Sequence, residues 1–131
     1  MRFKIPKNDE RFVWTNHSVD KMKQYQLSEQ RIKSVLNTPK RKEEGVAPNT
    51  EAVMQSTGSV KHPTEIWVMY QNISPNSKDK SQKEKSKFII FINKRIRIIS
   101  VWRYPGISLI RTVPNIPEEA WNALDGKDDI K

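Results

Sequence analysis

The sequence predicts an α+β protein in which two N-terminal helices pack on a twisted antiparallel sheet of about four strands, followed by a short C-terminal helix. Helical spacing of apolar residues before position 39 predicts the two helices. Segments rich in β-branched and aromatic residues between positions 42 and 102 predict the strands. The chain has 131 residues and no cysteine, so we expect one domain without disulfides.

The first helix is predicted to end at about Tyr25. Either Thr15 or Asn16 can cap its start, because both side chains carry an oxygen that accepts hydrogen bonds from unpaired N–H groups. Val19 and Met22 are three residues apart, and the same spacing reaches Tyr25. These three residues predict one apolar stripe that packs inward.

The second helix is predicted over residues 29–37, with Ser28 as its cap. Its apolar stripe consists of Ile32, Val35 and Leu36. Pro39 then ends the helix, because the residue before a proline disfavours helical geometry. The two helices together predict an αα-hairpin.

The candidate strands, in chain order, are residues 42–46, 50–57, 64–71, 88–92 and 95–102. The first of these is weak. Residues 88–92 are almost wholly apolar, which predicts burial on both faces. The turn at positions 93 and 94 then predicts a hairpin between residues 88–92 and 95–102.

Other segments are expected to lie outside these elements. Residues 1–11 are polar and should be flexible. Residues 12–14 are a short apolar lead into the first helix. Residues 73–87 are dominated by lysine, serine and other polar side chains, which predicts a disordered loop.

Residues 107–131 are expected to form a C-terminal extension. Within it, residues 117–124 predict a short helix, because a proline occupies the first turn and two glutamates lie at the positively polarised end. The final stretch contains Asp128 and Asp129 and is expected to be loose.

The net charge of +9 is unevenly distributed. Residues 115–131 carry five acidic and two basic side chains, a net of −3, so the first 114 residues carry +12. A basic body attracts polyanions, and RNA is the partner we expect before DNA. The alternative is that the charge serves solubility alone. The contrast also suggests that residues 117–131 fold back over the basic face and weaken binding.

The sequence contains no apolar run of the roughly 20 residues that a membrane helix needs, and its start does not resemble a signal peptide. We therefore expect a cytoplasmic protein without a membrane partner. It has no HExxH pattern and no glycine pattern of a phosphate loop, so neither a metal site nor a cofactor is predicted.

His17 is the candidate for acid–base chemistry. It lies in the first turn of the first helix, and an imidazole can both take and give protons at neutral pH. The alternative is a partly buried histidine with a structural role. His62 lies in a predicted turn, where a structural role is expected.

The last strand is rich in arginine. Strict alternation places Arg95, Arg97 and Arg103 on one face of the sheet. Arg103 and Tyr104 lie at the end of that strand, where arginine can grip phosphate and tyrosine can stack on a base or donate a proton. The alternative is that Arg97 is a surface charge and Tyr104 a packing residue.

A basic flank follows the second helix. Lys40 and Arg41, together with Arg31, could form a track for RNA phosphates. The alternative is a solvated edge without a ligand.

Residues 16–39 combine a histidine, a helix that carries methionine, a Leu-Ser turn, a second helix and an Asn-Thr-Pro end. This segment resembles a small family of uncharacterised domains that is similar to BrnT-type toxins and, more distantly, to RelE/ParE-type toxins. Residues 97–106, Arg-Ile-Ile-Ser-Val-Trp-Arg-Tyr-Pro-Gly, resemble its closing strand. The resemblance covers residues 12–106.

The resemblance implies a toxin-type, metal-independent ribonuclease that uses the RNA 2′-hydroxyl to attack the adjacent phosphate, and an acidic antitoxin protein as partner. It implies that His17 carries the proton, that Arg103 stabilises the transition state, that Arg97 contacts phosphate and that Tyr104 matches a C-terminal tyrosine. Residues 64–71 lack the lysine–arginine cluster of RelE-type enzymes, which argues against ribosome-dependent cleavage. The alternative function is a non-catalytic module of the same fold that binds RNA or a protein.

Overall fold

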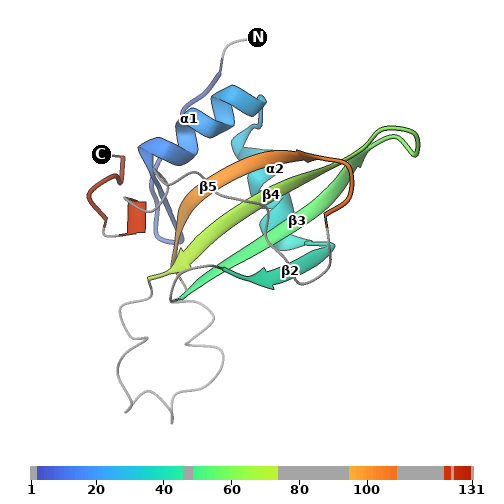
Figure 1. The fold of residues 1–131 in the computed structure, drawn as a ribbon. Helices are drawn as coiled ribbons and strands as arrows, with labels where there is room; N and C mark the ends of the chain where they lie inside the picture. The colour runs from blue at the N-terminus through green and yellow to red at the C-terminus, as the bar shows by residue number, and fades with distance from the viewer. Residues whose placement is uncertain (1–2, 46–48, 74–94, 109–122, 125, 131) are drawn as a thin grey trace.

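The computed structural model describes residues 3–45, 49–73, 95–108, 123–124 and 126–130. Its elements are β1 (Phe12–Trp14), α1 (Asn16–Tyr25), α2 (Glu29–Asn37), β2 (Arg41–Glu44), β3 (Thr50–Gly58), β4 (Pro63–Asn72) and β5 (Ile96–Pro105). The strands form one sheet in the order β1-β5-β4-β3-β2 (Figure 1). The predicted α+β class is confirmed. Neither helix in the described ranges is long and apolar enough to cross a membrane.

Both predicted helices are confirmed, and their caps explain where they begin. Thr15 Oγ1 accepts a hydrogen bond from the Ser18 N–H at 3.1 Å, and the Thr15 N–H donates to Ser18 Oγ at 3.1 Å. The Thr15 hydroxyl also donates to the Ile98 carbonyl at 2.9 Å. This bond ties the start of α1 to β5. Ser28 caps α2 by accepting from the Arg31 N–H.

Both faces of the sheet are packed. The face that carries the helices, called the helix face, buries Val19 and Met22 of α1 and Ile32 and Val35 of α2 against apolar strand residues. On the opposite face, the rings of Trp67 and Trp102 stack with centroids 6.0 Å apart. Because apolar burial is the main favourable term in folding, these two clusters fix the position of the strands under both helices.

The prediction of about four antiparallel strands is wrong. The sheet has five strands and is mixed, because β1 pairs in parallel with β5, with Phe12 opposite Ile96 and Trp14 opposite Ile98. Residues 12–14 were expected to be only a lead into α1. Their three side chains are all buried, and their partner strand lies more than 80 residues later, so no local pattern marks them as a strand.

Several predicted segments cannot be compared in full. The predicted strand at residues 88–92 and the loop at 74–87 lie outside the described residues, and so do residues 117–122 of the predicted C-terminal helix. Ala123 and Leu124 form a short 3₁₀ turn, and no α-helix occurs in the described residues after β5. The sheet neighbours of β5 are β1 and β4, and the other half of the predicted hairpin, at residues 88–92, lies outside the described residues.

A β-bulge in β5 overturns the prediction that Arg97 and Arg103 share a face. Met69 pairs with Ser100 and the next residue, Tyr70, pairs with Ile98, so β5 contains one extra residue there. An extra residue inverts the alternation beyond it. Arg97 therefore lies on the face opposite the helices, and Arg103 lies on the helix face.

Candidate functional site

His17 lies where α1 begins beside β5. Its imidazole is half-buried, and its Nε2 lies 3.2 Å from the hydroxyl oxygen of Ser100, a residue only 1% exposed. A buried hydroxyl has few alternative partners, so this contact restrains the plane of the ring. His17 thus presents a proton-carrying group whose position is fixed by two secondary-structure elements.

The described stretch of residues 126–130, called here the acidic strap, docks against the start of α1. The Asp128 carbonyl accepts from the Asn16 N–H at 2.8 Å, and Asp128 Oδ2 accepts from the His17 N–H at 2.8 Å. The Ile130 N–H donates to the Trp14 carbonyl at 2.9 Å. The expectation of a loose Asp128–Asp129 stretch is therefore wrong, because hydrogen bonds hold it beside β1 and α1 (Figure 1).

Asp128 occupies the positively polarised end of a helix. The first N–H groups of any helix have no partner inside it, and the helix dipole favours a negative charge there. In α1, Asp128 satisfies the N–H groups of Asn16 and His17, and Thr15 satisfies that of Ser18. A carboxylate of the chain itself thus fills an anion-binding position next to His17.

Arg97 binds the second acid of the strap. Its Nε lies 2.8 Å from Asp129 Oδ1 and its Nη2 lies 3.2 Å from Asp129 Oδ2, which is a two-point contact. Its Nη1 donates to Gln71 Oε1 at 2.7 Å, which holds the guanidinium plane from β4. Only 14% of the Arg97 side chain is exposed. This setting strengthens the contact relative to an exposed ion pair.

The structure therefore brings His17 together with Arg97 rather than with Arg103. Consecutive residues of the strap, Asp128 and Asp129, contact the His17 backbone and the Arg97 guanidinium. Arg103 lies near the other end of α1, where its Nε donates to the Tyr25 carbonyl at 3.0 Å. Eight residues of helix separate His17 from Tyr25, a rise of roughly 12 Å.

Tyr104 lies on the same face of the sheet as Arg97, opposite Glu65 of β4. It is partly exposed and packs against the cluster that contains Trp102. The structure does not bring Tyr104 to His17, because Ser100, the β5 contact of His17, lies four residues earlier on the strand.

The predicted basic flank lies at the other edge of the sheet. β2, which carries Arg41, is separated from β5 by β3 and β4, about 14 Å at ordinary strand spacing. Lys40 is exposed and its Nζ donates to Ser56 at 3.0 Å. Arg31 is half-buried on α2. These three residues do not join the site at His17.

Arg41 belongs to a polar cluster with a structural character. Glu65 is 2% exposed and accepts hydrogen bonds from Trp67 Nε1 at 2.9 Å and from the Ser108 hydroxyl at 2.6 Å. Arg41 lies 4.0 Å from Glu65 and 2.8 Å from Glu43. This cluster fastens residue 108, beyond the end of β5, to the sheet.

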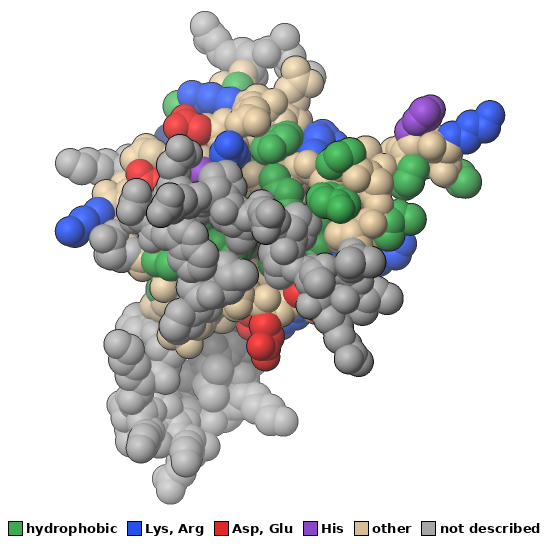
Figure 2. Space-filling view, in the orientation of Figure 1, with side chains coloured by type: hydrophobic (Ala, Val, Ile, Leu, Met, Phe, Trp, Pro, Cys, Tyr) green, Lys and Arg blue, Asp and Glu red, His purple; other side chains and the backbone are tan. Residues whose placement is uncertain are grey.

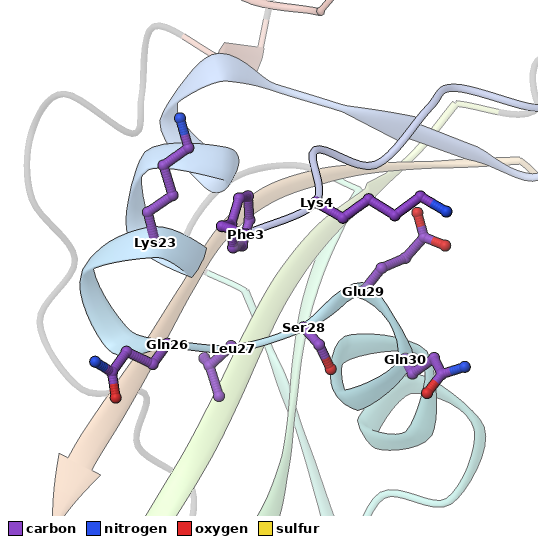
Figure 3. A pocket seen from close by; sticks show the side chains of 8 residues that line it. All are labelled: Phe3, Lys4, Lys23, Gln26, Leu27, Ser28, Glu29 and Gln30. Carbon is purple, nitrogen blue, oxygen red and sulfur yellow. The ribbon is translucent and has the colours of Figure 1, made fainter. Parts of the chain in front are cut away.

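A cavity of about 760 Å³ lies between the N-terminal arm and the turn from α1 to α2 (Figure 3). Phe3 and Lys4 of the arm form one wall, and Lys23 and Glu29 contribute charges of opposite sign. None of the predicted site residues lines it. The cavity is therefore separate from the site at His17.

The two histidines lie in different settings, as Figure 2 shows: one purple patch is on the projecting β3–β4 turn, which carries His62, and another is on the body of the molecule. Within the described ranges, no three His, Asp or Glu side chains are grouped so that they could hold a metal ion.

Sequence reasoning missed Ser100, Asp128 and Asp129 as members of this site. The charge contrast between the acidic end and the basic body did indicate that the end folds back, and residues 126–130 do so. Nothing in the local pattern pairs Asp129 with Arg97, which is 32 positions away. Comparisons with known proteins add no constraint, because no family model, no curated protein and no solved structure matches the chain.

Proposed function

We propose that the protein binds RNA at the site formed by His17, Arg97 and the start of α1, and cleaves it there without a metal ion. The observation that carries the proposal is the half-buried imidazole of His17, held by Ser100 at 3.2 Å beside an anion-binding position. The net charge of +9 supports a polyanionic substrate. The resemblance to toxin-type ribonucleases, which rests on residues 16–39 and 97–106, supports RNA as that substrate.

The proposed reaction uses the RNA's own 2′-hydroxyl. His17 takes the proton from this hydroxyl while the 2′-oxygen forms a bond to phosphorus. Arg97 and the N–H groups at the start of α1 stabilise the negative charge that develops on the phosphoryl oxygens. The bond to the 5′-oxygen then breaks, water gives a proton to that oxygen, and the proton held by His17 passes to the resulting hydroxide, which restores water and the neutral imidazole. The products are a 2′,3′-cyclic phosphate and a free 5′-hydroxyl.

Arg103 was predicted to stabilise the transition state and Tyr104 to match a C-terminal tyrosine, but here we propose that they contact nucleotides away from the reacting phosphate. Arg103 is exposed and Tyr104 is partly exposed, so both are accessible from solvent. Their places at the end of β5, several residues from Ser100, suit flanking nucleotides better than the reacting phosphate.

One observation favours the second candidate function, a non-catalytic binding module of the same fold. All three guanidinium nitrogens of Arg97 already have partners within the chain: Asp129, Gln71 and the Leu124 carbonyl. A catalytic arginine needs donors directed at the substrate. In the binding-module alternative, Arg97 acts as a structural anchor and RNA is held without being cleaved.

Cleavage of a labelled single-stranded RNA in buffer containing EDTA tests the catalytic proposal. We expect His17→Asn to slow cleavage by about 100-fold or more, as loss of a general base does. His62→Asn is the matched control, because His62 is exposed on the β3–β4 turn, and it should leave the rate unchanged. Equal rates for the two variants, or no cleavage by the folded wild-type protein, would reject a catalytic His17. RNA binding without cleavage would then favour the module.

A further inference from the structure

Two adjacent carboxylates of the acidic strap occupy two neighbouring positive positions of the body. The Asp128 carboxylate accepts from the His17 N–H at the start of α1, and Asp129 binds Arg97 with both oxygens. These are the groups that meet the RNA phosphate in the proposed function. Phosphate oxygens and carboxylate oxygens accept the same charge-assisted hydrogen bonds from N–H donors.

We propose that the start of α1 and Arg97 form a phosphodiester-binding site which the strap closes, so that RNA binds by displacing Asp128 and Asp129. The inference rests on the proposed function, because it names the ligand and the regulation of the same site. The strap is an internal competitor that reproduces the negative charge of the ligand. The fraction of molecules in which the strap is closed determines the fraction that can bind RNA.

The strap is attached in a way that permits its release. Its contacts to the body include hydrogen bonds to Trp14, Asn16 and His17 and the ion pair between Arg97 and Asp129, and none of its residues is fully buried. Ile130 contributes a partly buried side chain at the margin of the helix-face cluster. Segments with few buried apolar contacts open at lower free energy than the core, so the strap can leave while the sheet stays folded.

Release of the strap would free part of the Arg97 guanidinium without freeing all of it. The bond from Nη1 to Gln71 comes from β4 and remains when the strap leaves, so the guanidinium keeps its orientation. The two nitrogens that bind Asp129 become available together. They present the two-point geometry that suits a phosphate.

The strap carboxylates can be tested with charge-matched variants. In the first, Asp128→Asn and Asp129→Asn remove both charges of the strap. In the second, Glu10→Gln and Asp20→Asn remove two charges from exposed positions outside the strap. Both variants have the same net charge, so any difference between them comes from position rather than from total charge.

The affinity for a fluorescein-labelled single-stranded RNA is measured by anisotropy at about 0.1 M salt. We expect the strap variant to bind about tenfold more tightly than the control variant, as removal of a closed state populated about nine-tenths of the time would produce. Equal affinity of the two variants, or weaker binding by the strap variant, overturns the inference.

A second measurement uses the wild-type chain and does not depend on a variant that folds. The Ile130 N–H, which donates to the Trp14 carbonyl, should lose protection from hydrogen exchange when RNA saturates the protein. Unchanged protection at saturation means that RNA binds while the strap is closed, and also overturns the inference. Both readouts report binding, so they stay separate from the cleavage assay that decides the catalytic proposal.

Discussion

Two arginines on the same face of the sheet hold acids in different ways. Arg97 of β5 binds Asp129, a residue of the surface strap, with both side chains partly accessible at 14% and 25%. Arg41 of β2 faces Glu65, whose side chain is 3% exposed in the middle of the sheet. Glu65 also accepts bonds from Trp67 and Ser108, whereas Asp129 lies on a segment outside the strands of the sheet.

In the proposed function, the same pair of chemical groups serves folding at Arg41 and Glu65 and ligand binding at Arg97 and Asp129. Glu65 lies on a central strand and cannot leave without unfolding the sheet, so its contacts are permanent. Asp129 lies outside the sheet, on a segment that joins the body through hydrogen bonds and the Arg97 ion pair, so its displacement by a ligand is proposed here. The β2 edge therefore carries the structural cluster, and the side of the sheet formed by β1 and β5 carries the candidate site.

The largest expected effect is on stability at the β2 side. Glu65→Ala leaves the Trp67 and Ser108 donors and the Arg41 charge without their buried acceptor, so we expect it to lower the free energy of unfolding by about 3 kcal/mol. Asp129→Ala should cost about 1 kcal/mol, because water can replace the carboxylate at the surface. Urea denaturation of both variants measures the difference. If Asp129→Ala lowered the free energy of unfolding more than Glu65→Ala, Asp129 would be the structural residue and the assignment made here would be wrong.

A smaller effect concerns how stability depends on pH, and it comes from Glu51, a carboxyl group at a contact within the sheet. Glu51 of β3 is partly buried, which would raise its pKa, but hydrogen bonds from Lys42 and Tyr70 and the Lys42 charge outweigh burial and lower its pKa below the ordinary 4.5. Burial and the Glu51 contact raise the pKa of Tyr70, so the phenol stays a donor throughout the acid range.

Because the pKa of Glu51 is lowered by folding, its contribution to stability is complete above about pH 4.5 and is lost as the pH falls through the folded-state value. Glu51→Gln should therefore cost about 1 kcal/mol at pH 7 and reduce the loss of stability between pH 4.5 and lower pH. Urea midpoints at pH 7 and pH 3 provide the comparison. An identical acid slope in the variant would show that other carboxyl groups dominate.

Local sequence signals predicted a large part of the fold. Thr15 and Ser28 cap the helices as their side chains suggest, and four strand predictions, at residues 42–46, 50–57, 64–71 and 95–102, correspond to β2, β3, β4 and β5. β1 was not predicted, because three residues that are all buried show no alternation of apolar and polar side chains. Its pairing with β5 depends on the tertiary structure.

The candidate site was only partly predictable for a related reason. His17 was identified from its place in a helix start, which is a local signal. Strict alternation along β5 predicted that Arg97 and Arg103 share a face of the sheet. The bulge in β5, opposite Met69 and Tyr70, inverts the alternation, so the two arginines lie on different faces. The partner of Arg97 comes from a segment 32 residues away, so it is a product of the folded chain.

We predict that RNA binds where α1 begins beside β1 and β5, and not at the β2 edge of the sheet. Titration of the isotope-labelled protein with a short, non-cleavable RNA, followed by backbone amide NMR shifts, tests it most directly. We predict the largest shifts at His17, Ser100 and residues 126–130. Shifts concentrated at Lys40, Arg41 and Lys42, with His17 and the strap unchanged, would contradict the account.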